Sequence, residues 1–133
     1  MSGKYLLGNM LSALHNKNCF YDNPIKVVYS KICADVLKSM KKNGYIKDYI
    51  VFEEDGKKSI NVWLRVVNNN KNLTSFKLVS KPGRRLYLSA RELKKKKSYN
   101  PFILLLVSTS KGVLEINDAV KNNIGGEVLC EIF

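Results

Sequence analysis

Five consecutive residues near the C-terminal end of the chain combine hydroxyl, ammonium and glycine chemistry. They follow an apolar run at residues 102–107 and are Ser108, Thr109, Ser110, Lys111 and Gly112. Hydroxyl groups both donate and accept hydrogen bonds, so they suit phosphate oxygens, ribose hydroxyls and base edges. The lysine adds a mobile phosphate contact, and the glycine lets a ligand approach the backbone. The pattern predicts a loop that binds a polar polymer, although an ordinary turn at a strand exit has the same composition.

Two further segments carry compatible chemistry. One is a second glycine-rich loop, and the other places two cations beside an aromatic ring. Guanidinium and aromatic planes stack on bases and riboses, whereas a tyrosine within a strand commonly packs in the core. The first loop is not a Walker loop, because no glycine precedes Ser108 at the required spacing. The residues of the two added segments are Gly125, Gly126 and Glu127, and Arg84, Arg85 and Tyr87.

The charge balance of the chain favours a polyanionic partner. Of 133 residues, 23 are lysine or arginine and 11 are aspartate or glutamate, which gives a formal net charge of +12. A domain this basic is a candidate for binding nucleic acid or an anionic membrane. The run at residues 102–107 is far shorter than the roughly 18 apolar residues that a membrane span needs. We therefore expect a nucleic acid and no membrane partner.

The residue types that support catalysis or metal binding are sparse. Cys19, Cys33 and Cys130 have no C-x-x-C spacing, so neither zinc nor a disulfide framework is indicated. The single histidine, His15, has no carboxylate or second histidine close by in the sequence. Clustered carboxylates occur only at residues 53–55, within a turn pattern. We predict that the protein is not an enzyme and takes no cofactor, metal or small-molecule substrate.

The first part of the chain reads as two helices on a three-stranded antiparallel sheet. Apolar residues at helical spacing predict a helix over residues 6–17. A second helix is expected with Ser30 as N-cap and Gly44 just beyond its end. Three strands are then expected at residues 45–52, 59–67 and 73–80, the first two joined by an Asp55-Gly56 hairpin turn.

The second part reads as a smaller β-rich lobe with a short helix. Lys81, Pro82 and Gly83 form a strong chain break, which places the lobes at residues 1–80 and 81–133. After it we expect a short strand from Arg84 and a helical turn at residues 90–93. The lysines at 94–97 are expected to form a mobile loop, because a like-charge block cannot be buried. A buried strand to residue 107, a helix at 117–122 and a closing strand at 128–133 complete an α+β fold.

These segments, in this order, resemble the small-subunit ribosomal protein S8 (uS8) family of the bacterial and organellar type. The two loops carry the resemblance with S-T-S-K-G-V at 108–113 and I-G-G-E-V-L-C at 124–130. Supporting matches are S-K-P-G with R-L-Y at 80–87, S-K-I at 30–32 and G-Y-I at 44–46. The resemblance extends over almost the entire chain.

The resemblance implies a structural protein of the small ribosomal subunit that binds the central domain of the small-subunit rRNA and supports its assembly. Its partners would be that rRNA and neighbouring small-subunit ribosomal proteins. A free-standing RNA-binding translational regulator is the alternative. The expected RNA-binding residues are Ser108, Thr109, Ser110, Lys111, Gly112, Gly125, Gly126, Glu127, Lys81, Arg84, Arg85, Tyr87, Ser30, Lys31 and Asn16.

The chain also departs from the family pattern. Tyr5 and Leu6 replace the family's Asp-Pro pair at the first helix, and near the end of that helix only Asn16 agrees. Asn123 stands where the family commonly has glycine, and asparagine tolerates a positive φ better than other non-glycine residues. The lysine- and asparagine-rich composition, the lack of a presequence and the divergent first helix favour a mitochondrial ribosome, with a plastid or the bacterial cytoplasm as alternatives.

Overall fold

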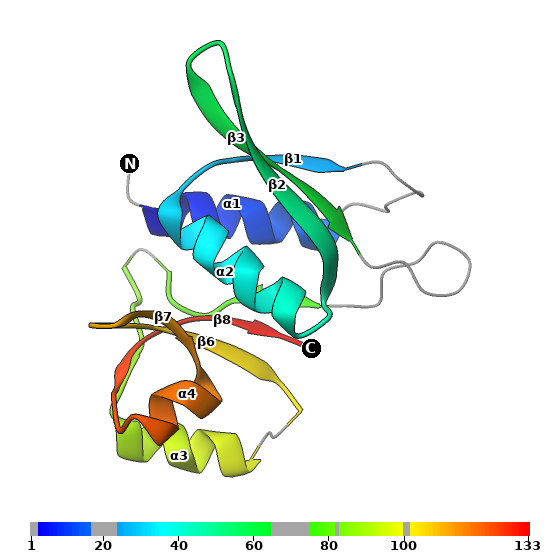
Figure 1. Cartoon of the computed structure of the whole chain (residues 1–133). Helices are drawn as coiled ribbons and strands as arrows, with labels where there is room; N and C mark the ends of the chain where they lie inside the picture. The colour runs from blue at the N-terminus through cyan, green and yellow to red at the C-terminus, as the bar shows by residue number, and fades with distance from the viewer. Residues whose placement is uncertain (1–2, 17–23, 65–74, 82, 100–101) are drawn as a thin grey trace. The chain divides into compact units, whose positions relative to one another are not determined.

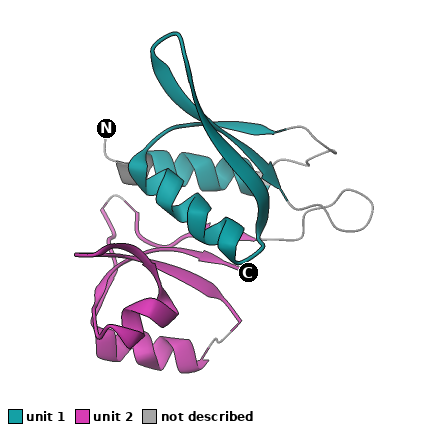
Figure 2. Cartoon of the chain, viewed as in Figure 1, with its two compact units in different colours: residues 1–74 teal, residues 75–133 magenta. Residues whose placement is uncertain are grey.

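The chain folds into two compact units in the computed structural model. They comprise residues Met1–Thr74 and Ser75–Phe133 (Figure 2). The structure describes residues 3–16, 24–64, 75–81, 83–99 and 102–133. No helix within these ranges is long and apolar enough to cross a membrane.

The first unit consists of two helices on one face of a three-stranded antiparallel sheet (Figure 1). The helices are α1 (Gly3–Asn16) and α2 (Lys31–Lys42), and the strands in spatial order are β1 (Ile25–Val28), β3 (Lys57–Leu64) and β2 (Ile46–Glu54). Alternate strand residues point to the helices, since neighbouring side chains on a strand face opposite sides. Ile25, Val27, Ile60 and Val62 are accordingly buried, and the predicted architecture of this unit is confirmed.

Local signals fix the ends of α2 and the turn that follows it. The Ser30 hydroxyl accepts a hydrogen bond from the Cys33 N–H at 3.1 Å, as expected of an N-cap. Gly44, one residue beyond the C-cap Asn43, has a φ of 79°. Asp55 and Gly56 have φ values of 52° and 76° between the paired residues Glu54 and Lys57. Positive φ at both central residues is the type I′ geometry that the Asp-Gly pair predicts.

The third strand of this sheet is β1, which the sequence patterns did not predict. Residues 73–80 were expected there, but Phe76–Leu78 form β4 in the second unit. The boundary between the two units therefore lies in the sequence between Thr74 and Ser75. This is six residues before the break expected at Lys81. The cause is that β4 pairs with the last strand of the chain, a partner too distant in sequence for a local pattern to reveal.

The second unit is built on an antiparallel sheet with the order β4-β8-β6-β7, and β5 also pairs with β8. Its strands beyond β4 are β5 (Tyr87–Leu88), β6 (Leu104–Thr109), β7 (Gly112–Glu115) and β8 (Gly126–Ile132). The helices α3 (Ala90–Tyr99) and α4 (Ile116–Lys121) lie side by side against it (Figure 1). Their buried residues Leu93, Ile116 and Ala119 form one core with Leu105, Val107 and Val128 of the strands.

The lysine run is helical, so the expectation of a mobile loop at residues 94–97 was wrong. The helix starts with a capping box, in which the Ser89 hydroxyl accepts from the Glu92 N–H and the Glu92 carboxylate accepts from the Ser89 N–H, each at 3.2 Å. Leu93 anchors the first turn in the core, and Lys96 pairs with Glu131 at 3.5 Å. Repulsion between like charges on a helix costs only a few tenths of a kcal/mol per pair, which these contacts outweigh.

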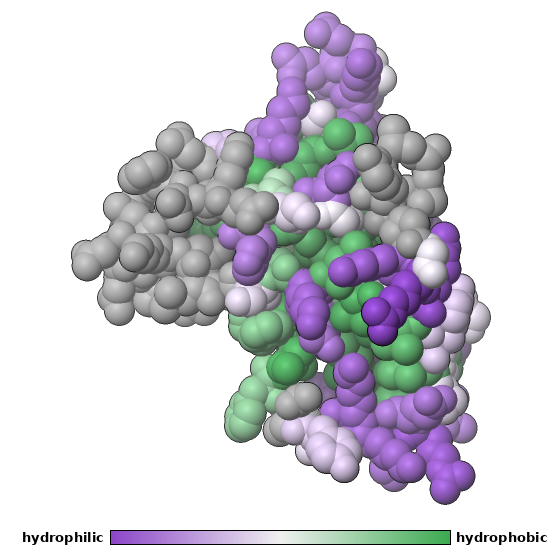
Figure 3. Space-filling model, turned by 180° about the vertical axis from the view of Figure 1, so that it is seen from behind, coloured by the Kyte–Doolittle hydropathy of each residue, from purple (hydrophilic) through white to green (hydrophobic). Residues whose placement is uncertain are grey.

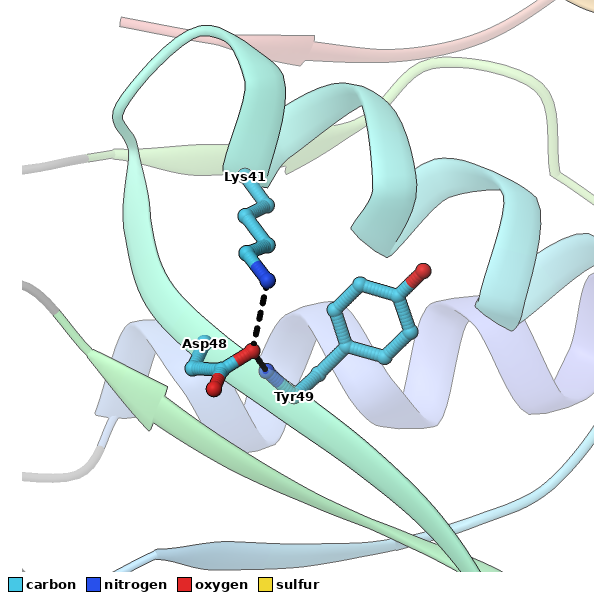
Figure 4. A network of polar contacts seen from close by, with 3 residues as sticks. All are labelled: Lys41, Asp48 and Tyr49. Atoms are coloured by element: carbon cyan, nitrogen blue, oxygen red, sulfur yellow. Dashed lines mark hydrogen bonds and ion pairs between the residues drawn. The ribbon is translucent and has the colours of Figure 1, made fainter.

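A polar network joins the end of α2 to the start of β2 (Figure 4). The Lys41 ammonium lies 2.9 Å from Asp48 Oδ1, which also accepts from the Tyr49 N–H at 2.8 Å. The ammonium stands 6.0 Å from the centre of the Tyr49 ring. The bond to Lys41, and then the Tyr49 N–H, lower the pKa of Asp48, and the bond to Asp48 raises the pKa of Lys41.

This network predicts the titration of Asp48. Because its folded pKa lies below its unfolded one, the carboxylate stabilises the fold above the ordinary aspartate pKa of about 4, and this is lost as pH falls through the folded value. Lys41→Gln should raise the pKa of Asp48, measured by NMR of the side-chain carboxyl carbon, whereas Lys47→Gln should leave it in place. If Lys41→Gln leaves the titration unchanged, the Tyr49 N–H alone holds the carboxylate.

Candidate nucleic-acid interface

Three segments that are separate in the sequence meet at one end of the second unit's sheet. Ser108 at the end of β6 pairs with Glu127 at the start of β8, and Glu127 pairs on its other side with Tyr87 of β5. The row Ser108, Glu127, Tyr87 therefore crosses three adjacent strands. The hydroxyl loop, the glycine loop and the cation-aromatic segment form one surface, which we call the strand-end site.

The β6–β7 turn presents two of its predicted residues to solvent and uses two others to shape itself. Ser110 and Lys111 connect the paired residues Thr109 and Gly112, and both are exposed. The Thr109 hydroxyl donates to the Gly112 carbonyl at 2.8 Å and accepts from the Lys111 N–H at 3.1 Å. Gly112 has a φ of 99°, which an L side chain rarely adopts. Thr109 and Gly112 thus shape the turn, and Ser110 and Lys111 are left to face a ligand.

Gly125 and Gly126 allow close packing of backbone segments. A Cβ on Gly125 would lie 2.5 Å from the Leu88 carbonyl oxygen, and one on Gly126 would collide with the Ser108 carbonyl. Both glycines were predicted to contact RNA. In the structure, their lack of a side chain lets neighbouring backbone segments pack closely and so forms the site. Asn123 before them has a φ of 54°, so the expectation that asparagine preserves this turn is confirmed.

A second tight turn carries Lys81 and Arg84. Lys81 and Arg84 exchange backbone hydrogen bonds at 3.1 and 2.9 Å, with Gly83 between them at a φ of 83°. The buried Ser80 hydroxyl accepts from the Leu86 N–H at 2.9 Å and so fixes the exit of the turn. Lys81 and Arg84 are exposed. Sequence reasoning missed Ser80, although its place at the start of the matched S-K-P-G segment was a usable signal.

Glu127 lies below the surface, with only 3% of its area exposed. Its Oε2 stands 4.0 Å from a terminal nitrogen of Arg85, whose side chain is 42% exposed. The carboxylate is thus placed to orient Arg85 and does not face solvent as a direct RNA contact would. Tyr87 is 63% exposed, so its ring is not a core packing residue.

The remaining predicted residues belong to the first unit. Ser30 uses its hydroxyl as the N-cap of α2, and Lys31 is exposed in the first turn of that helix. Asn16 ends α1, and its side chain lies outside the described residues.

The strand-end site is cationic and contains no metal centre within the described residues. Lys81, Arg84 and Lys111 have no carboxylate partner among the residues that the structure describes. Over the same residues, no group of histidine, cysteine or carboxylate side chains could hold a metal ion. The arrangement offers these cations, an exposed hydroxyl and an exposed ring, a set that suits phosphate, ribose and base.

Comparison with known proteins gives one consistent result. The family model described as Ribosomal protein S8 matches residues 6–133. The small ribosomal subunit protein uS8 of Nitratiruptor sp. is 36% identical over 132 residues, which cover 96% of this chain and 97% of the relative. The proteins of the same name from Campylobacter hominis and Helicobacter pylori are 37% and 36% identical over 129 residues, with the same coverage.

The close packing at Gly126 leads to a stability prediction. Gly126→Ala should lower the free energy of unfolding by about 1–3 kcal/mol, because the new methyl group must displace the Ser108 backbone. Chemical denaturation followed by circular dichroism would measure the change. Ser110→Ala in the neighbouring turn is the control and should leave stability within about 0.5 kcal/mol. A Gly126→Ala protein as stable as the parent would show that the strands separate without cost.

Proposed function

Because the chain belongs to the ribosomal protein S8 family, we propose that it is a structural constituent of the small ribosomal subunit that binds the central domain of the small-subunit rRNA and supports its assembly. The family is structural and not enzymatic, so the chain is not an enzyme. Its proposed partners are the small-subunit rRNA and neighbouring ribosomal proteins.

The observation that carries this proposal is the convergence at the strand-end site. Residues from the β6–β7 turn, the start of β8 and the segment around β5 are far apart in sequence, yet Ser108, Glu127 and Tyr87 are in register. The same three segments match the family pattern. A site assembled across three strands recognises a three-dimensional RNA shape better than an extended strand, since its contacts lie at fixed positions.

The proposed mechanism divides the work between charge and shape. Lys81, Arg84 and Lys111 neutralise phosphates and release counterions, which supplies affinity without sequence information. Ser110 offers a hydroxyl to a ribose 2′-hydroxyl or a base edge, and the Tyr87 ring is free to stack. Glu127 contributes by placing a carboxylate beside the Arg85 guanidinium.

The ribosome that contains the protein is proposed to be mitochondrial. This rests on the lysine- and asparagine-rich composition and on the divergent first helix. The named relatives come from bacteria, so a bacterial ribosome also agrees with the comparisons.

Sedimentation of native extracts tests the proposed function. The protein should migrate with small ribosomal subunits, and in fractionated eukaryotic cells it should do so in the mitochondrial fraction. A free pool bound to messenger RNA would instead support the translational regulator. Small subunits found only in plastids or in a bacterial cytoplasm would overturn the mitochondrial assignment and leave the ribosomal role intact.

The turn predicts the effect of Ser110→Ala. The change removes no charge, so the slope of log affinity against log salt should stay the same. The affinity for a central-domain rRNA fragment should fall about tenfold, because an RNA group in a dry interface is left without its partner, at about 1–3 kcal/mol. Filter binding at several salt concentrations would measure both quantities.

A matched pair at Thr109 controls for damage to the turn. Thr109→Ser keeps the hydroxyl that bridges Lys111 and Gly112, so affinity should be nearly unchanged. Thr109→Val removes it and should weaken binding by loosening the turn. If Ser110→Ala binds the fragment as well as the parent, the hydroxyl makes no contact that matters.

A further inference from the structure

The outer side of α3 carries cations that no carboxylate of the described residues pairs with. Arg91, Lys94, Lys95 and Lys97 are exposed, and none has a carboxylate partner among the described residues. Lys96 differs from them, since it pairs with Glu131 of β8. The one acidic residue of the helix, Glu92, is engaged in the capping box with Ser89.

Helical spacing arranges part of this side as a row. Arg91, Lys95 and Tyr99 are four residues apart and therefore lie one above the other on the same face, with Lys94 beside them. At 1.5 Å per residue the row is about 12 Å long, which corresponds to about three stacked nucleotides. Figure 3 shows hydrophilic residues gathered over the part of the second unit where α3 lies in Figure 1.

One exposed aromatic ring ends this row, and a second follows three residues further along the chain. Tyr99 is 84% exposed and Phe102 is 90% exposed. Large aromatic side chains with this exposure contribute almost nothing to the stability of the fold, because they bury almost no surface in it. Next to cations they form the combination that binds single-stranded nucleic acid, in which lysines follow the backbone and rings stack on bases.

We propose that the exposed side of α3, with Tyr99 and Phe102, is a second RNA-binding surface that takes an unpaired segment of the RNA. It rests on the proposed function only in that the ligand is RNA. The strand-end site uses fixed donors on turns to recognise a folded shape, whereas α3 offers a charged row and two rings that fit a flexible strand. The two surfaces therefore bind different parts of one RNA.

The burial of α3 argues against a membrane as the ligand. An interfacial helix inserts an apolar face into the lipid and leaves its cations at the headgroups. The one aliphatic residue of α3 larger than alanine, Leu93, is fully buried in the core of the second unit. Only the two rings remain for insertion, so the surface suits stacking on bases better than entry into a bilayer.

Phe102→Trp provides a direct reporter of stacking. The ring is 90% exposed, so the substitution should not disturb the fold, and the parent protein supplies the background emission of Trp63. Titration with a short uridine oligonucleotide should quench the added emission to saturation. A fully paired RNA of the same length should quench it little, because its bases are stacked on one another.

Two sets of variants separate the rings from the charges. Tyr99→Ala with Phe102→Ala should weaken oligonucleotide binding about tenfold or more and leave the salt slope unchanged. Arg91→Gln, Lys94→Gln and Lys95→Gln together should reduce the slope by about 2, at about 0.7 per phosphate contact of a single strand. The control with the same loss of charge is Lys38→Gln, Lys42→Gln and Lys47→Gln in the first unit, which should leave the quenching intact.

The outcomes distinguish this proposal from the proposed function. If both α3 variants bind the oligonucleotide like the parent, or if paired RNA quenches as strongly, the second surface is overturned. A blue shift of the introduced tryptophan's emission on phosphatidylglycerol vesicles, without quenching by RNA, would overturn it in favour of a membrane. Failure of the parent protein to bind the central-domain fragment would instead count against the strand-end site.

Discussion

The candidate RNA site depends on the close backbone approach between Gly126 and Ser108. The two residues belong to neighbouring strands, and a side chain on Gly126 would force those strands apart. Gly125 makes a similar approach to the junction between β5 and α3. Because β8 pairs with β4, β5 and β6, this packing brings three distant segments of the chain to one surface. The chemistry of the site therefore follows from residues that have no side chains.

Sequence patterns predicted the parts of the fold that local rules govern. The second helix, its Ser30 cap and the Asp55-Gly56 turn were all predicted, since each signal lies within a few residues. The sequence patterns gave wrong predictions where contacts between distant residues decide the structure. β1 is four residues long and was not recognised, and β4 was assigned to the wrong sheet because its partner is the last strand. The lysine run is helical against expectation, since the pairing of Lys96 with Glu131 of the last strand does not show in a local pattern.

The same limit applies to the site. The residues of the two loops and of the Arg84 segment could be named from the sequence, and the structure brings them together. The sequence did not reveal which of these residues support the site and which face outward. Thr109, Gly112, Gly125, Gly126 and Glu127 shape or support the site, and Ser110, Lys111, Arg84 and Tyr87 face outward. Burial and hydrogen-bond partners separate the two sets, and both properties belong to the folded chain.

The hydroxyl of Thr109 has a consequence for the thermodynamics of binding. By joining the Lys111 N–H to the Gly112 carbonyl, it holds the turn in one conformation before any ligand arrives. A flexible loop would lose conformational entropy on association, at about 1–2 kcal/mol for each residue that becomes ordered. The preorganised turn avoids most of this loss, so a larger share of each contact made by Ser110 and Lys111 remains as affinity. If RNA binds this turn as proposed, a small uncharged side chain contributes to recognition through the conformation that it fixes.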